Sequence, residues 1–169
     1  FNPDPATPDA QESRGLGDVY KRQIPFFMLS CVEVAQQKEE STLTKNSDSD
    51  DITFIIDLKV NPDSNEDLNL FVEEITQNVI DNEDFCIEYA YYVTEDKSSV
   101  TLYEKYIDSE SAVKHGQNFM GSPFFERFFN LFTLEKFIVT GPASEEFKNF
   151  TQENGFVIEY RNSIDGFLR

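Results

Sequence analysis

Four side chains that can exchange protons lie within one short stretch, VTLYEKYIDSESAVKH, from Val100 to His115. They are Tyr103, Glu104, Tyr106 and His115, and His115 is the only histidine of the chain. A histidine has an ordinary pKa near neutral pH, so His115 is suited to act as a base or as a proton donor. Glu104 interrupts an apolar strand, and burial would raise its pKa and make it a second acid or base. The stretch therefore predicts a site for proton transfer.

Each of these residues also has a structural interpretation. A lone histidine at a helix end is often exposed or interacts with the helix dipole, and a glutamate in a strand can pair with a lysine on a neighbouring strand. Tyr89, Tyr103 and Tyr106 can donate hydrogen bonds to a substrate oxygen, or they can pack in strands with a hydrated hydroxyl. Asn61 can orient a ligand carbonyl or shape a turn. The residue types alone leave both interpretations open.

Phenylalanines are concentrated directly after this stretch. They are Phe119, Phe124, Phe125, Phe128, Phe129 and Phe132, and they occupy nearly every side of one expected helix. A helix that is apolar all round is buried. Two alternatives follow: these rings line a pocket for an aromatic ligand, or they fill a core.

Hydrophobic periodicity predicts the scaffold that must position these groups. The expected strands are 52–60, 85–93, 99–107, 136–140 and 156–160. The expected helices are 65–81, a short helix that follows Asp108 and Ser109 and carries His115, and the segments 123–132 and 144–151. The order is β-α-β-β-α-β with an appended helix and strand. This order predicts an α+β fold of the ferredoxin-like type, a four-stranded antiparallel sheet with helices on one face.

Local patterns add detail to this scaffold. Ser64 and Asp67 are spaced as a capping box at the start of the first helix. The second strand should place Phe85, Ile87, Tyr89 and Tyr91 on one face.

The third strand is apolar on both faces, with Val100, Leu102 and Tyr106 on one and Thr101, Tyr103 and Ile107 on the other. A second copy of the same sheet is the simplest cover for the face without helices, which predicts a two-fold homodimer.

Composition excludes several classes of protein. The formal net charge of −18 over 169 residues makes nucleic-acid binding improbable, because phosphate backbones are repelled. No apolar run reaches the ~20 residues needed to cross a bilayer. Two cysteines are too few for a disulfide framework, and one histidine makes a zinc site improbable. No phosphate-binding loop is present.

The first part of the chain has a different character. Residues 1–23 include SRGLGDVYKRQ, which resembles a translated sequencing adaptor and is set aside. Residues 24–31, IPFFMLSC, resemble the end of a lipoprotein signal peptide whose Cys31 is lipidated; the alternative is an apolar fragment with a free cysteine. Residues 32–51 are polar and predict a flexible tether. The protein would then lie at the bacterial cell envelope on the periplasmic side, or in the cytoplasm if no signal is present.

Residues 52–169 resemble the antibiotic biosynthesis monooxygenase domain, also called the quinol monooxygenase family. The matching segments are Asn61-Pro62 after the first strand, EDFCIEY from Glu83 to Tyr89, LYEKYIDSESAVKH from Leu102 to His115, the Ser-Pro-x-Phe helix at 122–129, Gly141-Pro142 and the ending GFLR. The order and spacing of these segments over nearly the whole domain carry the resemblance.

The resemblance implies a dimeric α+β barrel and a cofactor-independent oxygenase for a small aromatic or quinone-like ligand. We assign catalysis to His115, Glu104 and Tyr106, and substrate binding to Asn61, Tyr89, Tyr103, Phe124 and Phe128, with no metal and no cofactor. The alternative is a non-catalytic ligand-binding or sensing module of the same fold. The haem-degrading branch of the family has a histidine in the segment matching 122–129 and a tryptophan near the position of His115. This chain has neither, which disfavours haem degradation.

Overall fold

A five-stranded sheet forms the centre of the computed structural model, which describes residues 43–168. The strands are β2 (Ile52–Val60), β3 (Cys86–Val93), β4 (Ser99–Tyr106), β5 (Phe132–Thr140) and β6 (Glu159–Arg161), in the order β3-β4-β2-β5-β6. The pairs β3·β4, β4·β2 and β2·β5 are antiparallel, and β6 runs parallel to β5. The predicted ferredoxin-like α+β fold is confirmed, with β6 as an added edge strand.

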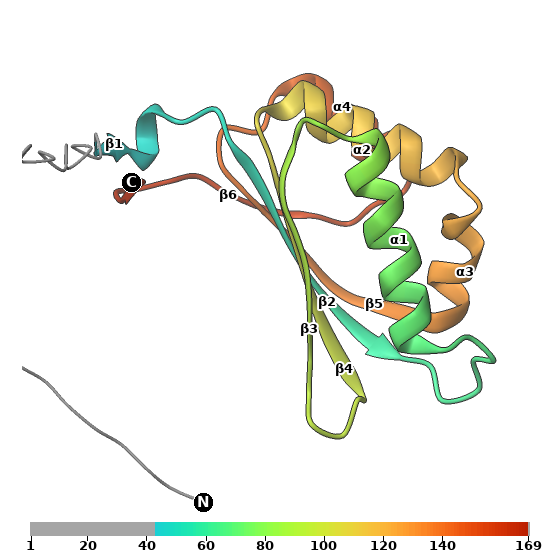
Figure 1. Ribbon diagram of the computed structural model, residues 1–169. Helices are drawn as coiled ribbons and strands as arrows, with labels where there is room; N and C mark the ends of the chain where they lie inside the picture. The colour runs from blue at the N-terminus through green and yellow to red at the C-terminus, as the bar shows by residue number, and fades with distance from the viewer. Residues whose placement is uncertain (1–42, 169) are drawn as a thin grey trace, which may run out of the picture. The chain divides into compact units, whose positions relative to one another are not determined.

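Four helices accompany the sheet. They are α1 (Leu68–Asn82), α2 (Ser109–Gly121), α3 (Phe124–Leu131) and α4 (Glu145–Glu153). Figure 1 shows α1, α2 and α3 on one face of the sheet, and α4 packs beside α2. No helix within residues 43–168 is long and apolar enough to cross a membrane.

The alternation of side chains along the central strands determines what faces the helices. Along β4, Val100, Leu102, Glu104 and Tyr106 are buried, and the residues between them are only partly buried. The same alternation along β2 directs Phe54 and its neighbours at every second position to the core. Because strand side chains alternate with a period of two, Glu104 is carried into the layer between the sheet and the helices.

The start of α1 differs from its prediction. Asp67 is the N-cap, and its side chain accepts a hydrogen bond from the Leu70 amide at 2.9 Å. The capping box with Ser64 is wrong, since the Ser64 hydroxyl accepts a hydrogen bond from the Glu66 amide at 3.2 Å, ahead of the helix. The side chains of Asp108 and Ser144 cap α2 and α4 in the same way.

An arginine on α3 binds α1 and the segment just before it. Arg127 donates two hydrogen bonds to Glu66, at 3.0 and 2.9 Å, and one to Glu74 at 2.8 Å. Its guanidinium group also lies over the rings of Phe71 and Phe124, at 5.2 and 5.6 Å from their centroids. These contacts hold the phenylalanine-rich helix against the rest of the helical layer.

Three strand predictions need correction. A register shift between Cys86 and Glu88 turns Ile87 outward, where 52% of the residue is exposed, so it does not share a face with Tyr89. Strand β5 begins at Phe132 rather than at residue 136. Strand β6 is Glu159–Arg161 and shares only residues 159–160 with the predicted strand 156–160.

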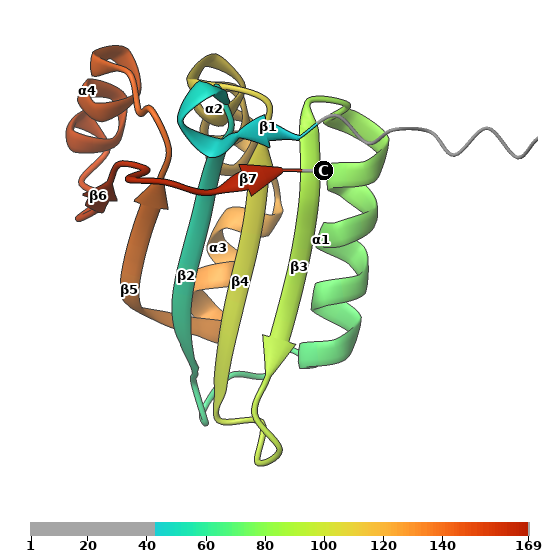
Figure 2. The ribbon, with the colours of Figure 1, turned by 90° about the vertical axis from the view of Figure 1, so that its left-hand side faces the viewer.

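The two ends of the described chain pair with each other. Strand β1 (Thr44–Lys45) is antiparallel to β7 (Phe167–Leu168), and the 3₁₀ helix η1 (Asn46–Asp48) follows β1. The predicted tether 32–51 therefore contains ordered elements within residues 44–48. Figures 1 and 2 show this pair projecting on the side of the sheet opposite α1–α3. The predicted segments 1–23 and 24–31, Cys31 included, and residues 32–42 lie outside the described residues.

The sheet face opposite the helices carries a mixed row of side chains. Ile55 on β2 pairs across the sheet with Tyr103 on β4 and with Ile138 on β5. Around this row, the Thr101 hydroxyl donates to Asp57 at 3.0 Å. This face is thus apolar at its centre with polar pairs around it.

Candidate active site

A small cavity lies between the sheet and the helices. Its volume is about 60 Å³. The residues around it come from β2, β3, β4 and β5, from α2, α3 and α4, and from the segment after α4. Seven phenylalanines contribute to the wall: Phe54, Phe119, Phe128, Phe129, Phe137, Phe147 and Phe150, with Phe156 as an eighth from the following segment. The polar groups in the wall are Glu104, His115, Tyr89 and Thr151. A cavity that is aromatic with one polar corner suits an aromatic ligand that carries an oxygen substituent.

His115 is buried and is held from both sides by carboxyl groups. Its Nδ1 atom lies 2.8 Å from Oε2 of Glu83, which is 5% exposed. The Asn118 side chain donates a hydrogen bond to the other oxygen of Glu83 at 3.2 Å. An ionised carboxyl group only accepts hydrogen bonds, so with Glu83 as a carboxylate the Nδ1 atom of His115 is the donor in this contact.

The other side of the imidazole faces Glu104. The Nε2 atom of His115 lies 3.5 Å from Oε2 of Glu104, and the Tyr106 hydroxyl donates to that same oxygen at 2.8 Å. The Tyr106 and His115 rings are 4.9 Å apart between centroids. The structure brings together all three residues to which the sequence analysis assigned catalysis: Tyr106 is hydrogen-bonded to Glu104, and His115 lies beside the same carboxyl oxygen.

Burial and neighbouring charges shift the proton affinities of this group. Burial raises the pKa of Glu104, although the charge of His115 and the Tyr106 hydrogen bond oppose this effect. Burial alone would lower the pKa of His115, but the nearby carboxyl groups of Glu104 and Glu83 outweigh it and raise that pKa. Both shifts favour the protonated form, so this buried group retains protons at pH values where exposed side chains would lose them.

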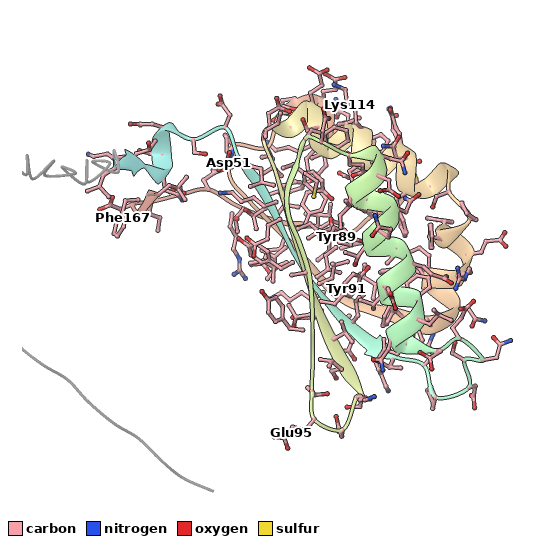
Figure 3. The ribbon with its side chains drawn as sticks, viewed as in Figure 1. Asp51, Tyr89, Tyr91, Glu95, Lys114 and Phe167 are labelled. Atoms are coloured by element: carbon pink, nitrogen blue, oxygen red, sulfur yellow. The ribbon has the colours of Figure 1, made fainter. Side chains whose placement is uncertain are left out.

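Tyr89 and Tyr91 form a second polar pair next to the first. Their hydroxyl groups lie 3.0 Å apart, and burial raises the pKa of both. Figure 3 shows both side chains in the layer between the sheet and α1. Only Tyr89 reaches the cavity wall. It remains a neutral hydrogen-bonding group at physiological pH.

Cys86 also lies close to the carboxyl groups. Burial, with smaller effects from Glu104 and Glu83, raises the pKa of its thiol to about 12. A thiol with this pKa is not a nucleophile at neutral pH. Within residues 43–168, no group of three or more His, Cys, Asp and Glu side chains is arranged to hold a metal ion.

Of the five residues predicted to bind substrate, only two line the cavity, Tyr89 and Phe128. Tyr103 is carried to the opposite face of the sheet because it alternates with Leu102 and Glu104. Phe124 packs instead under Arg127, next to α1.

Asn61 also lies elsewhere, in the turn after β2. Its amide donates to the Asn130 carbonyl at 3.0 Å, and its side-chain oxygen accepts from the Thr133 hydroxyl at 2.6 Å. These contacts connect the turn to the start of β5, so Asn61 shapes a turn, which was one of its two interpretations from the sequence.

Sequence reasoning missed Glu83 and Asn118. Glu83 ends α1 just ahead of β3, where a charged residue is usually solvated, and its partner His115 is distant in the chain. A usable signal existed in the spacing of His115 and Asn118: residues three apart on a helix point to the same side. Nothing in the local pattern identified the acid that both of them bind.

Gly116 and Phe150 close the cavity between α2 and α4. A Cβ atom on Gly116 would lie 2.6 Å from Cε1 of Phe150, so the ring rests on bare helix backbone. Gly116 follows His115 directly, and Phe150 is only partly buried. This ring therefore forms the part of the cavity wall that lies against α2.

The architecture can be compared with known structures. MupZ from Pseudomonas fluorescens superposes with a TM-score of 0.58 at 16% sequence identity, over 70% of this chain and 94% of that one. This chain has the fold of MupZ. The fold expected from the resemblance noted in the sequence is thereby supported by an independent structure.

Other structures match less closely. A conserved protein of unknown function from Bacteroides thetaiotaomicron gives a TM-score of 0.46 at 16% identity, over 54% of this chain and 96% of that one. SnoaB, a cofactor-independent oxygenase from Streptomyces nogalater, gives 0.44 at 14% identity, over 57% and 95%. No family model matches the sequence, and no curated protein matches it. Since fold does not determine activity, function has to be argued from the site.

Proposed function

We propose that this protein is a cofactor-independent monooxygenase that acts on a small hydroxylated aromatic substrate of the quinol type. One observation carries the proposal: Glu83, His115 and Glu104 form a buried chain of proton-binding groups that reaches the wall of an aromatic cavity at His115 and Glu104. The first step of such a reaction needs a base in an apolar setting, and these groups supply one.

The chemistry requires no electron carrier because the substrate supplies the electrons. Glu104 as carboxylate accepts the substrate proton, leaving an anion whose ring carbon can add O₂ and form a C–O bond. The peroxide anion takes up a proton from Glu104 or His115. The ring carbon of the resulting hydroperoxide then gives its C–H proton to Glu104, the O–O bond breaks, the carbon becomes a carbonyl, and the departing hydroxide takes up a proton from His115 and leaves as water. The substrate loses one O–H and one ring C–H hydrogen, so a phenol and O₂ become a quinone and one H₂O. The raised pKa values of both residues suit this exchange, because the proton donor and acceptor must alternate near neutral pH.

The cavity needs to widen before it can hold a substrate. Its 60 Å³ is less than half of the ~150 Å³ of an engineered cavity that takes up benzene. The partly exposed wall, at Phe150 and at Phe129, which is 39% exposed, is the part that can move without opening the sheet. Substrate admission by a shift of α4 or α3 is therefore part of the proposal.

Oxygen consumption by the purified protein with a panel of hydroquinones, naphthols and anthrones tests the proposal. We expect uptake with at least one substrate, a loss of tenfold or more in Glu104→Gln and His115→Ala, and a smaller loss in Tyr106→Phe. Tyr103→Phe is the matched control, since it removes the same hydroxyl from the same strand on the opposite face. Uptake that is equal in Glu104→Gln and wild type would refute the assignment.

A second candidate is a non-catalytic ligand-binding or sensing module. The small volume that the phenylalanine rings leave in the cavity favours it, because an enzyme of this kind is expected to have a pocket that already fits its substrate. Phenol binding, measured by calorimetry, without oxygen uptake on any panel member would select this candidate.

We also propose that two copies associate through the sheet face that carries Ile55 and Tyr103. An isologous contact would cover the apolar centre of this face. Sedimentation of wild type and Ile55→Glu tests it: the wild type should be a dimer and the variant a monomer. The predicted lipid anchor at Cys31 and the envelope location stay predictions, which mass spectrometry of membrane-extracted protein would check.

A further inference from the structure

Glu83 is a buried acid that the proposed reaction does not use directly. It does not line the cavity; it lies behind His115, on the far side of the imidazole from Glu104. A buried carboxyl group is unfavourable unless its oxygens are satisfied. Here both are: Oε2 by His115 at 2.8 Å, and Oε1 by Asn118 at 3.2 Å.

The two contacts of the imidazole are unequal. The Nδ1 contact with Glu83 has the length of a strong hydrogen bond, whereas the 3.5 Å between Nε2 and Glu104 is too long for one. The hydrogen bond at Nδ1 thus fixes the imidazole, whereas Nε2 is not hydrogen-bonded to Glu104. The orientation of the imidazole is also limited by the Phe119 ring, stacked at 6.2 Å with an interplanar angle of 4°, and by the Tyr106 ring.

We propose that Glu83 is a positioning residue: anchored by Asn118, it binds Nδ1 of His115 and so presents Nε2 to a ligand oxygen that lies in the cavity, within reach of both the imidazole and Glu104. The neutral imidazole then carries its proton on Nδ1 and offers an Nε2 lone pair, and the protonated ring donates from Nε2. The expected ligand has a hydroxyl or enol group that exchanges its proton with Nε2 of His115 or with the Glu104 carboxyl group. This inference rests on the proposed function for its chemistry, but the imidazole orientation can be tested without any turnover.

The single histidine makes the test direct. In the full-length protein labelled with ¹⁵N, the imidazole signals belong to His115 alone. Long-range ¹H–¹⁵N spectra across a pH titration report which nitrogen is protonated and at what pH the ring gains its second proton.

The ionisable groups that face the imidazole determine its tautomer and its proton affinity. Glu83 lies at the end of α1, Glu104 and Tyr106 are on β4, and Tyr89 is on β3; α2 itself contributes the neutral Asn118. In Glu83→Gln, Glu104 remains, so we expect the neutral tautomer to change from Nδ1–H toward Nε2–H. The proton affinity of the ring should fall by tenfold or more.

Matched variants decide between positioning and general stabilisation. Asp84→Asn removes one negative charge from the neighbouring, exposed position and should leave the tautomer unchanged. Glu83→Asp should restore the wild-type tautomer in part. If Glu83→Gln does not fold, Asn118→Ala, at an exposed position, should give a smaller change in the same direction.

A tautomer and titration in Glu83→Gln that equal those of Asp84→Asn would overturn the inference. If the wild type shows no oxygen uptake, the monooxygenase proposal fails, and the NMR result still decides the role of Glu83. If uptake is present, Glu83→Gln should lower kcat at least tenfold and shift the acidic limb of the pH profile, with KM little changed.

Discussion

The contact between Gly116 and Phe150 predicts a strong thermodynamic coupling between α2 and α4. Adding a Cβ to Gly116 has two opposing effects. Alanine improves the helix by about 1 kcal/mol relative to glycine in a helix interior. The same methyl group would lie 2.6 Å from Cε1 and 3.0 Å from Cζ of Phe150, both shorter than a van der Waals contact.

The size of the coupling follows from these two effects. Overpacking of this kind costs about 1–3 kcal/mol, so Gly116→Ala alone should change the free energy of unfolding by between zero and a loss of about 2 kcal/mol. In a Phe150→Ala background the clash is absent, and the same substitution should stabilise by about 1 kcal/mol. The coupling energy is then about 1–3 kcal/mol.

Guanidinium denaturation of the wild type, the two single variants and the double variant measures this cycle at one protein concentration. Phe150→Ala should itself cost about 2 kcal/mol, less than a fully buried phenylalanine. Gly116→Ala should also increase the rate at which a fluorescent phenol enters the protein, because the ring must leave its seat. A coupling energy below about 0.5 kcal/mol would show that the ring does not rest on the helix, and would refute this account of cavity closure.

Three further outcomes are expected. The pKa values of His115 and Glu104 are raised in the folded protein from their ordinary values of 6.5 and 4.5, so their protonation stabilises the fold. This stabilisation should be complete below the ordinary values and should be lost as pH rises through the folded pKa values. Thermal unfolding at stepped pH should show this loss, and the change of melting temperature with pH should be smaller in His115→Gln. Arg127→Ala should lower the melting temperature more than Arg127→Lys, because lysine keeps the charge, and the difference should shrink in high salt. Equal effects would show that the charge beside Glu66 and Glu74 does not contribute, and an Arg127→Lys variant as stable as the wild type would show that the paired hydrogen bonds to Glu66 do not matter. In a Cys31→Ser background, Cys86 should resist iodoacetamide at pH 8 until denaturant is added, because its pKa is raised to about 12. Mass spectrometry measures the labelling, and rapid labelling of the folded protein would contradict this pKa.

Period-two and period-3.6 patterns predicted the parts of the fold that depend on local sequence. The bounds of β2 and the placement of Glu104 and Tyr106 on one face follow from alternation alone. The same rule, applied through the bulge at Cys86–Glu88, placed Ile87 on the wrong face, because one extra residue reverses every later side chain.

The candidate site could be predicted only in part for a different reason. His115 and Glu104 lie in one strand–helix unit, so their proximity is local. Glu83 and Phe150 reach the site from other elements, through contacts set by tertiary packing. Tyr103, equally close in sequence, is excluded from the cavity by the same alternation that places Glu104 and Tyr106 on its opposite face, so its assignment to substrate binding conflicted with the predicted strand.

The pairing of β1 with β7 has a mechanical consequence. The chain enters the described domain at Thr44 and leaves it at Leu168, and these two residues are register partners. A load applied between the two ends would therefore open this pair in an unzipping direction, one hydrogen bond at a time, before reaching the five-stranded sheet. The short pair would yield at low force and absorb strain from any attachment at either end, while Glu83, His115 and Glu104 stayed in register inside the domain.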